Sequence, residues 1–288
     1  KTVRRRTQAG ATVRKAASVS PLVPLHGGIV YGPVRSRRLG RSLGINLTPA
    51  NIKLCSFNCT YCQYGWTQAP RRPELIELER WPSASTVARA VGQAFRVLAA
   101  RQEHVDRLTF AGHGEPTIHP RFADVIREVI RLRDAEAPKL PIAILSNAST
   151  LDRPEVVDVL RAVDERYMKL DAGDAAMLRS VNGAVVPFEQ IVEGLESLAD
   201  ITIQAMFVRD RTGRVDNTSE MAVIRWVTAL QQIKPRAVHI YTIDRAPAWP
   251  YLQPAPIARL HEIAQRVRQA GLTCAVFGHE GTGHPAEP

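Results

Sequence analysis

The sequence predicts an α/β domain in which parallel strands alternate with helices. Short apolar stretches recur along the chain, and segments with apolar residues at helical spacing separate them. There are about six such strand–helix units, fewer than the eight of a closed barrel. A partial (β/α)6 TIM-like barrel and a doubly wound sheet both fit this pattern. Both architectures place functional residues at the carboxyl ends of the strands.

Each expected strand is a short apolar run that stops at a proline, a glycine or a polar residue. The strands cover residues 42–48, 107–111, 140–145, 166–170, 201–208 and 237–243, and a short extra strand fits 273–277. The expected helices cover residues 83–101, 119–133, 154–163, 187–198, 217 or 219 to 233, and 256–270. Ser83 or Ser85 fits the first N-cap, Pro154 fits the first turn of the third helix, and Gly271 fits the last C-cap.

Composition divides the chain into three segments. Residues 1–30 form a basic arm that we expect to be flexible, residues 31–278 form the barrel domain, and residues 279–288 form a loose tail. No run of about 18 apolar residues is present, so we expect no membrane helix. The basic N-terminus is not followed by an apolar signal segment. The few, clustered cysteines suit a reducing cytosol, so we expect a cytoplasmic location.

The positive charge is concentrated near the N-terminus. The formal net charge is +10, yet residues 1–73 hold 13 Lys and Arg and no acidic residue. The rest of the chain has 25 basic residues against 28 acidic ones. A basic segment of this kind fits a nucleic-acid partner. It fits equally a solvated tail with arginines that bind anions inside a site.

Three of the four cysteines lie close together, as Cys55, Cys59 and Cys62 in a C-x3-C-x2-C pattern. One loop with three thiolates suits a soft metal centre, and a cubane cluster held by three thiolates keeps one iron without a protein ligand. Alternatives are a zinc site completed by His26 or His113, and a redox-active cysteine pair. The distant Cys274 fits an ordinary core thiol.

The spacing of the cysteines, with Tyr61 just before the last one, resembles the cluster loop of the radical S-adenosylmethionine (SAM) superfamily. The segment from Gly112 to Glu115 is similar to the Gly-Gly-Glu motif of that superfamily, with His113 between two glycines. The resemblance implies a partial barrel, SAM as a second cofactor and a [4Fe-4S] cluster on Cys55, Cys59 and Cys62. The residues that it implies near SAM are Tyr61, Gly114, Glu115, Ser146, Asn147 and Asp171.

Within the superfamily, the chain resembles the branch of the wybutosine-type tRNA enzymes and their stand-alone bacterial relatives. The similar segments are residues 31–40, 44–49, 62–65 and 114–117. No cysteine precedes Cys55, so we do not expect the second cluster of the wybutosine enzymes. Lys169 fits a side chain that reaches solvent, or an ion pair with Asp171, better than a Schiff base with a substrate.

The resemblance implies reductive cleavage of SAM and abstraction of hydrogen from a substrate. A tRNA nucleoside is one substrate class, and a small molecule or a peptide is the alternative. A different alternative is a non-enzymatic, metal-bearing nucleic-acid-binding module. The enzyme would need an electron donor such as flavodoxin or ferredoxin, and residues 31–41, rich in glycine and arginine, are the candidate lid.

Overall fold

The computed structural model describes residues 22–67 and 76–278. The predicted tail at 279–288 lies outside these residues, as does most of the predicted N-terminal arm. The last part of that arm is described and contacts the domain, because Val23 donates its backbone N–H to Gln63 O at 2.9 Å.

The centre of the fold is an eight-stranded sheet whose strand order is β1-β2-β3-β4-β5-β6-β8-β10. The antiparallel pair β1–β2 lies at one edge, and the strands from β2 to β10 run parallel. The bounds are β1 Val30–Ser36, β2 Gly40–Ile45, β3 Arg107–Phe110, β4 Ile142–Ser146, β5 Glu165–Lys169, β6 Ile201–Met206, β8 Ala237–Tyr241 and β10 Cys274–Phe277. Spatial order follows chain order without the reversal that a doubly wound sheet requires. The partial barrel is therefore confirmed, with β10 as the extra strand expected at 273–277.

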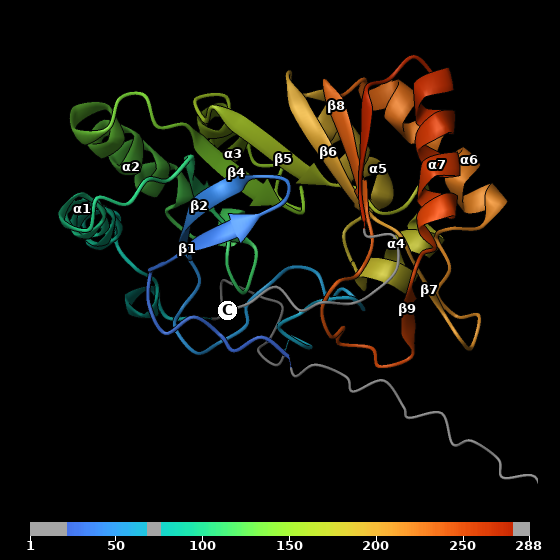
Figure 1. Ribbon diagram of the computed structural model, residues 1–288, viewed down its shortest axis with the longest axis horizontal. Coiled ribbons are helices and arrows are strands. Elements are labelled where there is room, and N and C mark those ends of the chain that lie inside the picture. The colour runs from blue at the N-terminus through green and yellow to red at the C-terminus, as the bar shows by residue number, and fades with distance from the viewer. Residues whose placement is uncertain (1–21, 68–75, 279–288) are drawn as a thin grey trace, which may run out of the picture.

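The helices lie along the outer side of the curved sheet, and hairpin β1–β2 forms one edge of the sheet (Figure 1). Their bounds are α1 Ala84–Ala100, α2 Phe122–Glu136, α3 Pro154–Leu160, α4 Ala175–Asn182, α5 Phe188–Glu196, α6 Glu220–Ile233 and α7 Ile257–Gln269, with 3-10 turns at Leu78–Arg80 and Pro116–Ile118. Helix α4 was not predicted, although its sequence carries both end signals. Asp174 caps its N-terminus, and Gly183 adopts φ 55° after its last residue.

Local signals explain most helix ends. Ser83, the first of the two candidate caps, accepts a hydrogen bond from the Thr86 amide at 3.2 Å. Pro154 begins α3, and Gly271 adopts φ 82° just beyond α7. Several expected boundaries are wrong by a few residues: the strand expected over 42–48 ends at Ile45, and the helix expected over 119–133 runs over Phe122–Glu136. The strand predicted over 201–208 breaks at Phe207. The chain then forms β7 (Val208–Asp210), which pairs with β9 (Leu252–Pro254) in a separate two-stranded sheet.

Alternation along the strands separates an apolar outer face from a polar inner face. Met168 and Ile203 point to the helices and are fully buried there. Trp226 of α6 packs in the same layer and donates its indole N–H to Leu170 O at 2.9 Å. Lys169 and Gln204, next to these residues in sequence, therefore face the inside of the barrel. None of the helices in the described ranges is long and apolar enough to cross a membrane.

Candidate functional site

The cysteine loop connects β2 to the segment before α1 and lies at the carboxyl ends of the strands. Its three cysteines are partly buried free thiols, whereas Cys274 is buried in the core. The loop is docked on the C-terminus of α4. Asn58 donates its backbone N–H to Asn182 O at 2.8 Å, and the Thr60 amide donates to Val181 O at 2.9 Å. The unpredicted helix α4 therefore supports the loop.

Gly114 lets the segment that follows β3 pass directly against the cysteine loop. A short parallel bridge joins Gly114 to Leu54, the residue before Cys55. A Cβ atom on Gly114 would lie 1.9 Å from the Leu54 carbonyl oxygen. Glu115 continues this contact by donating its backbone N–H to Leu54 O at 3.2 Å. Only glycine fits here without displacing the start of the loop.

The carboxylate of Glu115 joins the ends of β3 and β4. One of its oxygens accepts hydrogen bonds from the Ser146 hydroxyl at 2.8 Å and from the amide and hydroxyl of Thr117. The other accepts from the Asn147 amide at 2.7 Å. Burial raises the pKa of Glu115, although these hydrogen bonds lower it in part. Because protein donors surround the carboxylate, its main effect is to fix Ser146 and Asn147.

Two asparagine amides lie against two of the cysteine sulfurs. Asn147 Nδ2 lies 3.6 Å from Cys55 Sγ, and Asn182 Nδ2 lies 3.3 Å from Cys59 Sγ. N–H groups that point at sulfur favour the thiolate and tune a metal cluster bound to it. Asn147 was predicted from its place after a strand. Asn182 was missed, because its only sequence signal is its position before Gly183.

The buried carboxylate of Asp171 accepts hydrogen bonds from several other polar groups of this region. One oxygen accepts from the Tyr61 hydroxyl and from Asn182 Nδ2, the latter at 2.7 Å. The other accepts from the Met206 amide at 2.7 Å and pairs with Lys169 Nζ at 2.9 Å. Of the two expected roles of Lys169, the structure shows the ion pair with Asp171. Burial and the adjacent Asp171 raise the pKa of Tyr61 well above its ordinary value, so this phenol stays protonated.

Without a cofactor, the cysteine environment favours protonated thiols. Burial, followed by the charge of Asp171, raises the pKa of Cys59 to about 11. Burial also raises the pKa of Cys55, with further contributions from Cys59 and Glu115. Metal ligation requires the thiolate, so binding a cationic cluster must release protons from these residues.

The histidines considered for a zinc site have their ring nitrogens engaged elsewhere. His113 Nδ1 accepts from the His26 amide at 3.1 Å, and Nε2 lies 3.2 Å from Pro49 O, which fixes the tautomer with hydrogen on Nε2. The ring of His26 stacks on Tyr31 and contacts the Tyr64 hydroxyl at 2.9 Å. Within the described ranges, no three His, Cys, Asp or Glu side chains gather around a single metal position. A multi-iron cluster has no such requirement, because each thiolate binds its own iron.

The predicted site residues thus come together at one rim of the barrel. Hydrogen bonds link the cysteine loop to the ends of β3, β4 and β5 through Glu115, Asn147 and Asp171. The rim offers three thiols on one loop, amide donors at two of the sulfurs, and hydroxyl and carboxylate groups beside them. This donor set fits an iron–sulfur cluster with a polar organic cofactor next to it.

Comparison with known proteins agrees with this chemistry. The sequence profile of the Radical SAM superfamily matches residues 52–213, more than half of the chain. The chain belongs to the radical SAM superfamily. It is also 31% identical over 242 residues to a UPF0026 protein of Methanocaldococcus jannaschii, a match that covers 82% of this chain and 70% of the relative. The UPF0026 proteins are stand-alone relatives within the superfamily.

Solved structures show the same fold at low sequence identity. A radical SAM methyltransferase from Sphaerobacter thermophilus superposes with a TM-score of 0.60 at 14% identity, over 82% of this chain and 66% of that chain. SuiB of Streptococcus suis, bound to S-adenosylmethionine, superposes with a TM-score of 0.57 at 17% identity, over 82% of this chain and 50% of that chain. The present chain thus spans about half to two thirds of these proteins.

Membership in the superfamily identifies the chain as an iron–sulfur enzyme that uses a [4Fe-4S] cluster and SAM. An electron donor is required for this chemistry. The family therefore decides against the alternative of a non-enzymatic binding module.

The close contact between Gly114 and the Leu54 carbonyl oxygen can be tested by adding a methyl group at residue 114. Gly114→Ala should lower the free energy of unfolding by about 1–3 kcal/mol, because the new methyl group overlaps Leu54 O. It should also reduce the iron bound per chain after anaerobic reconstitution, since the cysteine loop must move. The matched control is Gly27→Ala, whose Cβ would meet nothing within 4 Å. Wild-type stability and iron content in Gly114→Ala would contradict this account of the loop.

Proposed function

We propose that Cys55, Cys59 and Cys62 hold the [4Fe-4S] cluster and that SAM binds beside them at the rim of the barrel. The observation that best supports this proposal is that one loop carries three free thiols. The side-chain amides of Asn147 and Asn182 face two of the three sulfur atoms. When bound, the cluster and SAM supply an electron and a 5′-deoxyadenosyl radical that takes a hydrogen atom from the substrate.

Different residues around the loop would contact different parts of SAM. Gly114 is the proposed contact for the methionine end, on the side of its backbone that Leu54 O does not occupy. Ser146 and Asn147 are the proposed contacts for the ribose and carboxylate, and Glu115 holds both in place through its hydrogen bonds. Asp171 is proposed to lie near SAM as well, although protein donors occupy its two oxygens in the structure. Its role here is to position Tyr61.

Tyr61 is the proposed aromatic neighbour of the adenine. Its hydroxyl is tied to Asp171, and Lys169 Nζ lies 4.9 Å from the centre of its ring. A ring held at its hydroxyl presents a fixed apolar surface, which suits stacking by a planar base.

The segment proposed as a lid, residues 31–41, forms most of hairpin β1–β2. Its turn reaches across the inside of the barrel, because Leu39 packs with Ala143 and Tyr167 and Arg38 contacts Gln204. We propose that the hairpin covers the substrate and keeps water away from the radical. Residues 22–30 contact the barrel as well, so we propose that the catalytic domain begins before residue 31.

The finer proposal for the substrate is a tRNA nucleoside. The absence of acidic residues before Glu74, together with 13 Lys and Arg in residues 1–73, supports an acidic macromolecular partner. The resemblance to the wybutosine-type branch supports the same substrate class. Flavodoxin or ferredoxin is the proposed electron donor, and the cytoplasm is the proposed location.

Production of 5′-deoxyadenosine tests the proposed chemistry. The anaerobically reconstituted chain, given dithionite and SAM, should form 5′-deoxyadenosine. Cys59→Ala should reduce the product to background, since it removes one of the proposed cluster ligands. Cys274→Ala, which alters a thiol of the core far from the loop, should keep the activity. A wild-type chain with a formed cluster but no product, or an active Cys59→Ala variant, would overturn the proposal.

Salt-dependent RNA binding tests the finer proposal. The full chain should bind tRNA in a filter-binding assay at 50 mM salt and lose affinity steeply by 200 mM, because cationic contacts to phosphate release counterions. Deletion of residues 1–20, which carry six of the basic side chains, should flatten this salt dependence. The absence of binding by the full chain at low salt would exclude tRNA as the substrate.

A further inference from the structure

A row of polar side chains crosses three neighbouring strands on the inner face of the barrel. Lys169 on β5 pairs in register with Gln204 on β6, and Gln204 pairs with His239 on β8. Residues that pair in register on parallel strands point to the same face of the sheet. Their neighbours Met168 and Ile203 point to the helices and are fully buried, so the row faces the interior.

Gln204 is only 2% exposed, and only one end of its side-chain amide has a hydrogen-bond partner. Its Oε1 accepts from Arg38 Nη1 at 2.9 Å, but its Nε2 has no partner among the residues that the structure describes. His239, which pairs in register with Gln204 on the next strand, has a buried Nδ1 that also has no partner there and that donates or accepts according to its tautomer. A buried donor without an acceptor costs about 1–3 kcal/mol. The unpartnered amide donor of Gln204 indicates a position where a ligand supplies the missing acceptor.

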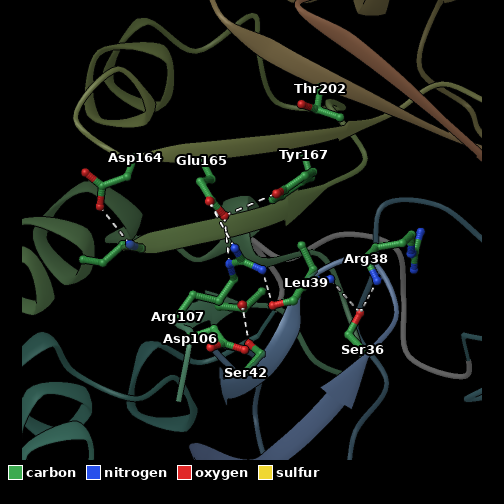
Figure 2. Close-up of polar contacts among 12 residues, drawn as sticks. Ser36, Arg38, Leu39, Ser42, Asp106, Arg107, Asp164, Glu165, Tyr167 and Thr202 are labelled. Atoms are coloured by element: carbon green, nitrogen blue, oxygen red, sulfur yellow. Dashed lines mark hydrogen bonds and ion pairs between the residues drawn. The ribbon is translucent and has the colours of Figure 1, made fainter. Parts of the chain in front are cut away.

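Arg38 brings a positive charge to this position from the hairpin turn. Its guanidinium lies 3.8 Å from the centre of the Tyr241 ring, and no acidic partner is found for it in the described part of the chain. Glu165, on the same side of the sheet, is paired with Arg107 at 2.9 Å. The Arg38 side chain points away from that pair (Figure 2).

The charges around the row leave an excess of one positive charge. Lys169 is balanced by Asp171 at 2.9 Å, so the charge of Arg38 remains. The phenol of Tyr241, which accepts from Lys169 Nζ at 2.9 Å, lies in the resulting field. Burial raises the pKa of Tyr241, but Arg38 and Lys169 lower it by more, so the net shift is downward. The field therefore favours a negative group at this position.

We propose that Arg38 and Gln204 bind an anionic group of the substrate, a carboxylate or a phosphate. This inference rests on the proposed function, because it names the substrate class of the same barrel. Gln204 lies two residues before the end of β6, which places it about 7 Å below the rim assigned to SAM. The anion can belong to a small molecule or be the phosphate of a nucleotide within RNA.

Calorimetric titration of the reconstituted, SAM-loaded chain with inorganic phosphate, acetate and a 5′-phosphorylated RNA trinucleotide tests the site. At least one probe should bind to the wild type. Arg38→Ala should weaken that binding about tenfold or more, since a charged hydrogen-bonding group is lost. Gln204→Leu should weaken it by a smaller factor while keeping a similar side-chain volume. Tighter binding of the trinucleotide than of the free anions would identify RNA as the source, and the reverse would identify a small molecule.

The matched control is Arg37→Ala. It removes the same charge from the same turn, but Arg37 is half exposed and is paired with Asp244 at 2.5 Å. Three results would overturn the inference: no probe binds to the wild type, Arg37→Ala weakens binding as much as Arg38→Ala, or Arg38→Ala weakens SAM binding instead. Formation of 5′-deoxyadenosine, measured on the same preparations, separates the two proposals. Product without anion binding rejects only the anion site, whereas absence of product rejects the proposed function.

Discussion

The buried carboxylate of Asp171 is the interaction on which the rest of the site depends. It receives hydrogen bonds from the cysteine loop through Tyr61, from α4 through Asn182 and from β6 through the Met206 amide. It also balances the charge of Lys169. A buried carboxylate is tolerated only when its oxygens accept hydrogen bonds, because an unpaired buried charge is costly in free energy. Moving any of these partners away would leave an oxygen of Asp171 unpaired, so each partner is held in position. The cysteine loop and the interior of the barrel are therefore positioned by the same group.

The strand order of the sheet then determines which face is available for the cofactors and the substrate. Strand order follows chain order, so all crossovers place their helices on one face and leave the other face for polar groups. The outer positions of β5 and β6 are apolar and buried against the helices, whereas Lys169 and Gln204 on the inner face are polar. Hairpin β1–β2 covers part of this inner face. The fold thus supplies a rim for the cofactors and an interior for a substrate.

The sequence was sufficient for the elements whose signals are local. Apolar strand runs predicted the barrel, Ser83 predicted the start of a helix, and the cysteine spacing predicted membership in the radical SAM superfamily. The contacts that act over long distances in the chain were not predictable. Asn182 carries no signal that it will face Cys59, because that depends on how α4 docks. Arg37 and Arg38 are adjacent and chemically alike, yet one pairs with exposed Asp244 and the other contacts buried Gln204. Only the direction of the hairpin turn distinguishes them.

The central claim is that the three cysteines hold a cluster with one iron open to SAM. Electron paramagnetic resonance of the reduced, reconstituted chain tests it directly, because the spectrum reports the ligands of the cluster. We predict that adding SAM changes the shape and g-values of the signal, as expected when a ligand binds to the open iron. A signal that is identical with and without saturating SAM would contradict the account.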